Sequence, residues 1–211
     1  KPISLAKLLA IVSQALASRA SSSETARRPA PAFPSEPVGN SPVMQILRTK
    51  VEQAAQHESP VLITGESGIG REALARFIHS RSGRKGDFVV LDHSRLEGEN
   101  VRTYLLGQDR ASDGQPGAFD LAMGGTLFLG EIQRIPPDAR KIINQVLESG
   151  QFAHEGGAGR RPLNCRVIAS GSANLIDLAH REPSLEQLYY RLNVLALAIP
   201  SLRERPDDVP D

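Results

Sequence analysis

Apolar residues recur in short blocks along residues 38–211, and the blocks are of two kinds. Some are runs of four to six mostly apolar residues with no polar face, at 61–64, 88–91, 126–129, 166–169 and 194–199. Others have apolar residues three and four positions apart, following Pro42 and Arg71 and within 136–149. The first pattern is typical of strands buried on both faces, and the second of one face of a helix. Their alternation predicts an α/β fold, with a parallel sheet flanked by helices.

The first 37 residues have a different pattern. In residues 4–19 the apolar positions again lie three and four apart, which predicts an amphipathic helix. A secretory signal is the alternative, although Lys7 and Gln14 interrupt its apolar stretch. Residues 20–37 are mostly small, polar or proline, so we expect a linker there. Because the chain starts at Lys1 and stops in a polar stretch, we expect it to be a fragment of a longer protein.

The net charge, the hydrophobic pattern and the cysteine content exclude several classes of protein. The chain has 25 Lys and Arg against 24 Asp and Glu, so its net charge of +1 gives no footprint for strong nonspecific nucleic-acid binding. No apolar run approaches the roughly 20 residues needed to span a bilayer, so no membrane partner is expected. A single cysteine, Cys165, excludes an internal disulfide framework and fits a cytoplasmic protein. No Cys/His cluster has zinc spacing, so no metal ligands are assigned.

The segment from Gly65 to Glu72 reads Gly-Glu-Ser-Gly-Ile-Gly-Arg-Glu, between a predicted strand and a predicted helix. Glycines there let backbone N–H groups close around phosphates, and the helix N-terminus adds its dipole. The usual phosphate-binding pattern ends Gly-Lys-Ser/Thr, whereas this chain has Arg71 and Glu72 at those places. By itself the segment fits a phosphate loop and a plain glycine-rich turn equally well.

Further motifs follow in a fixed order: Val-Gly-Asn-Ser-Pro, Gly-Gly-Thr-Leu-Phe-Leu, Gly-Gln-Phe, Tyr-Tyr-Arg-Leu-Asn-Val and Leu-Arg-Glu-Arg, at 38–42, 124–129, 150–152, 189–194 and 202–205. With the loop, they resemble the AAA+ domain of bacterial enhancer-binding proteins, the activators of sigma-54 RNA polymerase. The family loop typically reads Gly-Glu-Ser-Gly-Thr-Gly-Lys-Glu, so Glu72 agrees and Arg71 departs. The resemblance covers 38–211 and implies a P-loop NTPase AAA+ fold.

The resemblance also implies a domain order. Lys1-Pro2 and the helix after it look like the end of a receiver domain, although a simple linker helix is the alternative. We therefore expect the C-terminal helix of a receiver at 1–19, a linker at 20–37 and an AAA+ sigma-54 interaction domain at 38–211. The family's helical lid and DNA-binding domain would follow residue 211.

Site residues are carried over from the matching motifs. Residues near the adenine and around the phosphates of ATP would be Val38, Gly39, Gly65, Glu66, Ser67, Gly68, Ile69, Gly70, Arg71 and Glu72. The catalytic residues would be Glu131, which polarises the attacking water, and Arg191, which reaches the nucleotide of a neighbouring subunit. A solvated surface glutamate is the alternative for Glu131. Arginines at 160–161 and 203–205 suit phosphate ligands or are solvated surface charge.

Four positions depart from what the family's ATPases need. Arg71 replaces the lysine, Gly130 replaces the aspartate that anchors Mg²⁺, Ser172 replaces the asparagine of a polar sensor, and Leu185 replaces the first of two interface arginines. A guanidinium can still hold a phosphate by two hydrogen bonds. The departures therefore imply retained ATP binding, doubtful Mg²⁺ binding and impaired hydrolysis.

The loop by which the family contacts sigma-54, Gly-Ala-Phe-Thr-Gly-Ala, is not found after Leu105-Leu106-Gly107. We interpret the nearby Gly117-Ala118-Phe119 as a packing segment. The sequence thus predicts a transcriptional regulator in which ATP or a related nucleotide controls assembly of a homo-oligomer. RNA polymerase holoenzyme is a candidate partner, a sigma-54 contact is doubtful, and DNA would be bound by the domain beyond 211. An active ATPase that remodels sigma-54 polymerase and an assembly module without ligand stay open as alternatives.

Overall fold

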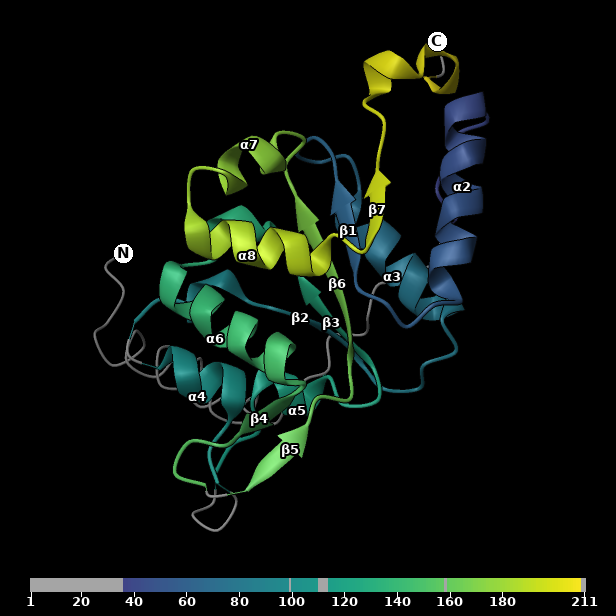
Figure 1. Ribbon diagram of the computed structural model, residues 1–211. Coiled ribbons are helices and arrows are strands. Elements are labelled where there is room, and N and C mark those ends of the chain that lie inside the picture. The colour runs from purple at the N-terminus through teal and green to yellow at the C-terminus, as the bar shows by residue number, and fades with distance from the viewer. Residues whose placement is uncertain (1–35, 99, 110–113, 158, 210–211) are drawn as a thin grey trace, which may run out of the picture. The chain divides into compact units, whose positions relative to one another are not determined.

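The structure is a computed structural model that describes residues 36–98, 100–109, 114–157 and 159–209 (Figure 1). The expected receiver helix at 1–19 lies outside the described residues, as does the expected linker apart from residues 36 and 37.

In the described chain, five parallel strands form one sheet in the order β2-β3-β6-β1-β7. Their bounds are β1 Val61–Thr64, β2 Phe88–Val90, β3 Thr126–Leu129, β6 Arg166–Gly171 and β7 Leu195–Ala198. Strand β1 lies inside the sheet, because Val61 pairs with Ile168 of β6 and with Leu195 of β7. The five predicted strands and the parallel α/β sheet are confirmed.

Helices cover both faces of the sheet (Figure 1). On one face lie α2 (Pro42–Ala55) and α3 (Arg71–Arg81), and on the other lie α4 (Val101–Leu106), α5 (Ala118–Leu121), α6 (Pro137–Ser149), α7 (Leu175–Ala179) and α8 (Pro183–Leu192). The side chains of β1 alternate accordingly: Val61 and Ile63 pack with α2 and α3, whereas Leu62 packs in the cluster of the other face. The first three residues of β1 are therefore buried in one core cluster or the other, which is why the sequence shows no polar face there.

The helices α2, α3 and α6 were predicted, and Gly150 ends α6 in a left-handed conformation with φ of 64°. The helices α4, α5, α7 and α8 were not predicted, because most have four to six residues and show too few turns for a helical period. A short hairpin of β4 (Gln151–Ala153) and β5 (Arg160–Pro162) was also not predicted. Phe119 is fully buried beside Phe152, so the interpretation of this residue as packing is confirmed.

One buried cation anchors α2 to the sheet. Arg166, at the start of β6, is 1% exposed and donates hydrogen bonds to the carbonyls of Ala54, Ala55 and Ser59. The first two carbonyls belong to the last turn of α2, where helix carbonyls lack partners within the helix. The far end of α2 is thereby held in place, and its first turn faces the site described next.

Short 3₁₀ turns complete the described chain: η2 (His93–Arg95), η4 (Ile132–Arg134), η5 (Leu202–Glu204) and η6 (Pro206–Asp208). Among the described residues, no helix is both long and apolar enough to cross a membrane.

Candidate nucleotide-binding site

The carboxyl ends of β1, β3 and β6 meet at one edge of the sheet, where parallel α/β proteins bind ligands. There the loop from Gly65 to Gly70 joins β1 to α3. Gly68 and Gly70 have φ of 78° and 97°, a left-handed conformation that favours glycine. The loop borders a pocket of about 330 Å³ whose lining includes Ser67, Phe128 and Ser170. At its floor, the first N–H groups of α3 have no partner within the helix, which suits an anion.

Arg71 fills the lysine position with its guanidinium inside this pocket. The side chain is only 8% exposed. One terminal nitrogen donates a 2.7 Å hydrogen bond to Oε1 of Glu131, and the other donates a 2.5 Å hydrogen bond to the carbonyl of Gly171. The fork of Arg71 therefore bridges the ends of β3 and β6.

Glu131 is held on three sides. Its backbone lies in the left-handed region, with φ of 43° and ψ of 64°, and its N–H donates to Oγ of Ser170 at 3.1 Å. Its Oε2 accepts a 3.1 Å hydrogen bond from Arg134, whereas Oε1 accepts the bond from Arg71. These contacts, Arg134 first, lower the pKa of Glu131 against the opposing effect of partial burial. A carboxylate with a lowered pKa that is paired with two guanidinium groups is a weak base for activating water.

Ser172, which replaces the asparagine of the family's polar sensor, lies outside the pocket. Ser172 has a buried Oγ without a hydrogen-bond partner among the described residues, and it does not line the phosphate pocket. Ser170, two residues earlier, lines the pocket and holds Glu131. Ser170 was not predicted as a site residue, because it lies in a run that is typical of a buried strand. In the structure it follows Ala169, the last residue of β6 that pairs with β3, and it thereby reaches the site.

The two carboxylates that line the pocket, Glu72 and Glu131, are both paired with arginines. Gly130 lines it without a side chain, both oxygens of Glu131 are hydrogen-bonded to arginines, and Glu72 pairs with Arg76 at 2.7 Å. Within the described ranges, no three His, Cys, Asp or Glu residues are grouped so that they could hold a metal ion. The loop amides and Arg71 suit a phosphate anion, whereas a Mg²⁺ ion would have to compete with arginines for both carboxylates.

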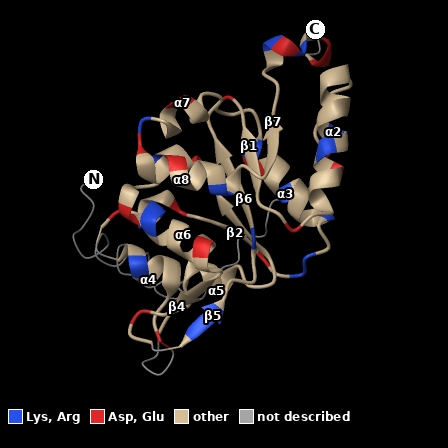
Figure 2. Cartoon of the chain, viewed as in Figure 1, with Lys and Arg blue, Asp and Glu red and all other residues tan. Residues whose placement is uncertain are grey.

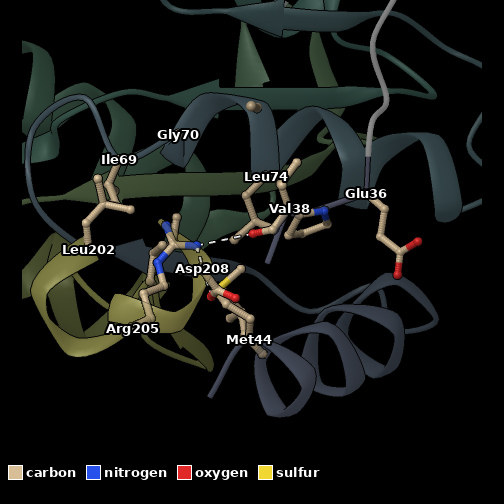
Figure 3. A pocket seen from close by; sticks show the side chains of 13 residues that line it. Glu36, Val38, Met44, Ile69, Gly70, Leu74, Leu202, Arg205 and Asp208 are labelled. Carbon is tan, nitrogen blue, oxygen red and sulfur yellow. Dashed lines mark hydrogen bonds and ion pairs between the residues drawn. The ribbon is translucent and has the colours of Figure 1, made fainter. Parts of the chain in front are cut away.

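Figure 3 shows a second pocket, of about 320 Å³. This pocket adjoins the first, because Gly70 and Ala73 line both. Its walls are largely apolar and include Met44, Leu74 and Leu202. Val38, predicted to lie near the adenine, lines this pocket, and so does Ile69. An apolar cavity with a few convergent polar groups is the usual form of a small-molecule site. Below, the pocket beside the loop is called the phosphate pocket, and this apolar pocket next to it is called the base pocket.

Polar groups of 202–208 close the second pocket. Arg205 donates a 3.2 Å hydrogen bond to the carbonyl of Val38 (Figure 3), and Asp208 accepts hydrogen bonds from Asn40 and Ser41. Ser41 begins α2, as its Ser-Pro pair predicted, but its side chain does not cap the helix and donates instead to Asp208. No sequence pattern predicts this pairing, because Ser41 and Asp208 are 167 positions apart.

The other predicted residues lie around the two pockets. Glu66 forms an ion pair with Arg203, which ties the loop to the 202–204 turn. Gly65 has no room for a side chain, because an added Cβ would lie 3.0 Å from Ile69. Gly39 has φ of 129° and does not itself line either pocket. Arg161, in the basic strand β5 (Figure 2), is engaged with Asp120 at 3.2 Å and lies away from these pockets.

Arg191 lies apart from these groups. It is on α8, its side chain is 34% exposed, and its nearest acidic partner is Glu148 at 3.6 Å. It lines neither pocket of its own chain. Leu185, on the same helix, is buried in the core, so the place of the first interface arginine has become a packing position.

Comparison with known proteins agrees with this geometry. The family model described as the sigma-54 interaction domain matches residues 37–198. The C4-dicarboxylate transport transcriptional regulatory protein DctD of Rhizobium meliloti is 38% identical over 185 residues, which cover 82% of this chain and 39% of DctD. The DNA-binding transcriptional regulator NtrC of Bradyrhizobium is 36% identical across the whole chain and 45% of NtrC.

Solved structures give the same result. NtrX from Brucella abortus in complex with ATP has a TM-score of 0.71 at 31% identity, covering 99% of this chain and 45% of NtrX. Its complex with ADP has a TM-score of 0.74. The P-loop NTPase domain of a sigma-54 transport activator from E. coli, at 22% identity and a TM-score of 0.53, supports the fold alone. The chain spans less than half the length of the DctD, NtrC and NtrX proteins it matches. With a P-loop α/β fold and a family match over most of its length, the chain belongs to the sigma-54 interaction domain family of bacterial transcriptional regulators.

Proposed function

We propose that this domain is the nucleotide-responsive part of a transcriptional regulator. It binds ATP or a related nucleotide through the phosphate loop and the adjoining pocket, and the bound nucleotide controls homo-oligomerisation with little or no hydrolysis. The relatives NtrC and DctD are transcriptional regulators, and NtrX has been solved with ATP and with ADP. These findings support the proposal for a chain that is about a third identical to them.

The observation that carries the proposal is the buried guanidinium of Arg71 in the phosphate pocket. It is 8% exposed, and it lies where glycine amides and the start of α3 also favour an anion. An incoming phosphate can replace Glu131 as its acceptor, since phosphate oxygens accept two parallel bonds from a guanidinium. Binding is thus supported by groups that the chain retains.

Turnover needs groups that the chain has lost. Hydrolysis of a nucleoside triphosphate depends on a metal that neutralises the developing charge and on a base or orienting group for water. Gly130 supplies no metal ligand, and Glu131 is paired with Arg71 and Arg134. We therefore expect bound ATP to persist and to act as a signal.

The remaining roles belong to the whole protein and extend the proposal. Arg191 is exposed enough on α8 to reach a neighbouring subunit in a homo-oligomer. RNA polymerase holoenzyme is the partner that the family implies, a direct contact with sigma-54 is not part of the proposal, and DNA would be bound through a domain outside this chain. The setting would be cytoplasmic, as the single cysteine and the family suggest.

Calorimetric titration with ATP and ADP, with and without Mg²⁺, tests the proposal when phosphate release is measured on the same sample. We expect both nucleotides to bind with similar affinity, with little dependence on Mg²⁺ and with no phosphate release above background. Mg²⁺-dependent turnover would contradict the proposal and favour an active ATPase. Absence of binding by any nucleotide, together with concentration-dependent oligomers, would favour an assembly module without ligand.

A further inference from the structure

The carboxylate of Asp208 joins two segments at opposite ends of the described chain. Its Oδ1 accepts hydrogen bonds from the backbone N–H of Asn40 at 2.5 Å and of Ser41 at 2.7 Å, and its Oδ2 accepts one from the Ser41 hydroxyl at 2.6 Å. The side chain is only 2% exposed. The hydroxyl of Ser41, followed by the two amides, lowers the pKa of Asp208, so the group is an anion at neutral pH.

The same carboxylate binds the chain immediately before the first turn of α2. Asn40 and Ser41 are the two residues before Pro42, where the helix begins, and the Ser41 side chain makes no capping hydrogen bond to the helix. Asp208 supplies the acceptor from η6, and its negative charge lies at the positive end of the helix dipole. These hydrogen bonds thus fix η6 and the start of α2 relative to each other.

Gly39 shows how closely the two segments approach. An added Cβ at this residue would lie 2.5 Å from Oδ2 of Asp208, and its φ of 129° is a conformation that favours glycine. Next to it, the carbonyl of Val38 accepts a hydrogen bond from Arg205, which itself lies 3.8 Å from Asp208. The walls contributed by Val38 and Arg205 to the base pocket are therefore fixed by contacts that converge on Asp208 (Figure 3).

We propose that Asp208 is a positioning residue that builds the base end of the nucleotide site. Its hydrogen bonds join η6 to residues 40–41, and they thereby hold Val38, Leu202 and Arg205 at the spacing that accepts a nucleobase. This inference rests on the proposed function, and it assigns a role within that site to a residue outside the phosphate loop. A ligand that binds more tightly when these hydrogen bonds are formed also stabilises them. Nucleotide binding would therefore hold the 202–208 segment in place.

The proposal predicts an effect on one end of the ligand only. Asp208 lines the base pocket and is absent from the lining of the phosphate pocket. Its loss should therefore weaken ligands that carry a base and spare ligands that consist of phosphate alone. A residue with a merely structural role would weaken both.

The test compares ADP with inorganic tripolyphosphate on the same variants, in calorimetric titrations of the full chain without Mg²⁺. Asp208→Asn removes the charge and one acceptor position. Because hydrogen bonds to a charged acceptor are stronger than those to a neutral one, we expect ADP to bind about tenfold more weakly. Tripolyphosphate affinity should change by less than about twofold, within the effect of an ordinary surface substitution.

Two further variants keep the result interpretable. Asp207→Asn is the same substitution at the exposed neighbouring residue, and we expect it to leave both affinities unchanged. Ser41→Ala removes only the hydroxyl donor, so it should weaken ADP by a smaller factor and remain measurable even where Asp208→Asn fails to fold. Equal losses for ADP and tripolyphosphate, or unchanged ADP binding in folded Asp208→Asn and in Ser41→Ala, would overturn the positioning role. Failure of both ligands to bind the unaltered chain would instead overturn the proposed function.

Discussion

The two ends of the candidate site differ in how their polar groups are arranged. At the phosphate end, Arg71 and Glu131 pair with each other inside the pocket. At the base end, Asp208 is satisfied by donors of a neighbouring segment, and the cavity walls beside it stay apolar. The two ends depend on different polar residues, so under the proposed function a loss of catalysis at one end would leave ligand recognition at the other intact. The experiments below separate the two ends.

The largest effect is expected at the phosphate end. Arg71→Ala removes the buried guanidinium, so ATP, ADP and tripolyphosphate should all bind about 100-fold more weakly, which corresponds to about 3 kcal/mol. Calorimetry measures the affinities, and thermal unfolding reports any loss of fold. Arg81→Ala, at the exposed far end of the same helix, is the matched control. An unchanged tripolyphosphate affinity in folded Arg71→Ala would remove Arg71 from the site.

The next effect is expected at the base end. Gly39→Ala forces a side chain into a left-handed backbone and against Asp208, so we expect a loss of about 2–3 kcal/mol of unfolding free energy. Gly68→Ala, in the phosphate loop, has a similar φ penalty with open space around the added Cβ, and should cost about 1–2 kcal/mol. Chemical denaturation measures both values. Equal losses of unfolding free energy in the two variants would mean that the contact of Gly39 with Asp208 contributes nothing to stability.

A smaller effect tests the missing metal anchor. Gly130 has room for a side chain, since an added Cβ would make only ordinary contacts with Phe128 at 3.5 Å and His93 at 3.9 Å. Gly130→Asp therefore places a carboxylate beside the phosphates, and Mg²⁺ should then strengthen ATP binding about tenfold, where the unaltered chain shows less than about a twofold change. Gly130→Ala supplies the Cβ without the carboxylate and should behave like the unaltered chain. Strong Mg²⁺ dependence before any substitution would refute the assignment of Gly130.

The smallest effect concerns the opposite edge of the sheet, where α3 ends and β3 begins. Nδ1 of His79 on α3 lies 2.8 Å from Oγ1 of Thr126 on β3, and burial first, then the charge of Arg84, lowers the pKa of His79. Because the unfolded chain binds this proton more readily, stability should fall as the pH drops from about 6.5 through the lowered pKa. Denaturation midpoints between pH 7 and 5 measure the slope, and His79→Gln should make it shallower. A slope that His79→Gln leaves intact would assign the pH dependence to other groups.

The sequence by itself determined the layers of the fold and the family. Runs such as 61–64 and 126–129 carry no polar face, because both sides of those strands are buried, and this property is readable without any tertiary information. The glycines of the phosphate loop are equally readable, since left-handed turns at Gly68 and Gly70 restrict which residue can be present. The short helices α4, α5 and α7 escaped prediction because one or two turns show no period.

Only the tertiary structure decided which polar groups meet. The partners of Glu131 include Arg71, 60 residues earlier, and Ser170, 39 residues later, and Asp208 is separated from Ser41 by 167 positions. Such pairs are created by the order of the strands and by the path of the chain across the sheet edge, which a linear pattern does not encode. Ser170 therefore lines the site and Ser172 does not, and Ser41 donates to a distant carboxylate and does not cap its own helix. The local sequence determined which residues have groups that can bind a phosphate. The topology of the chain determined which of those groups already pair with one another in the folded protein.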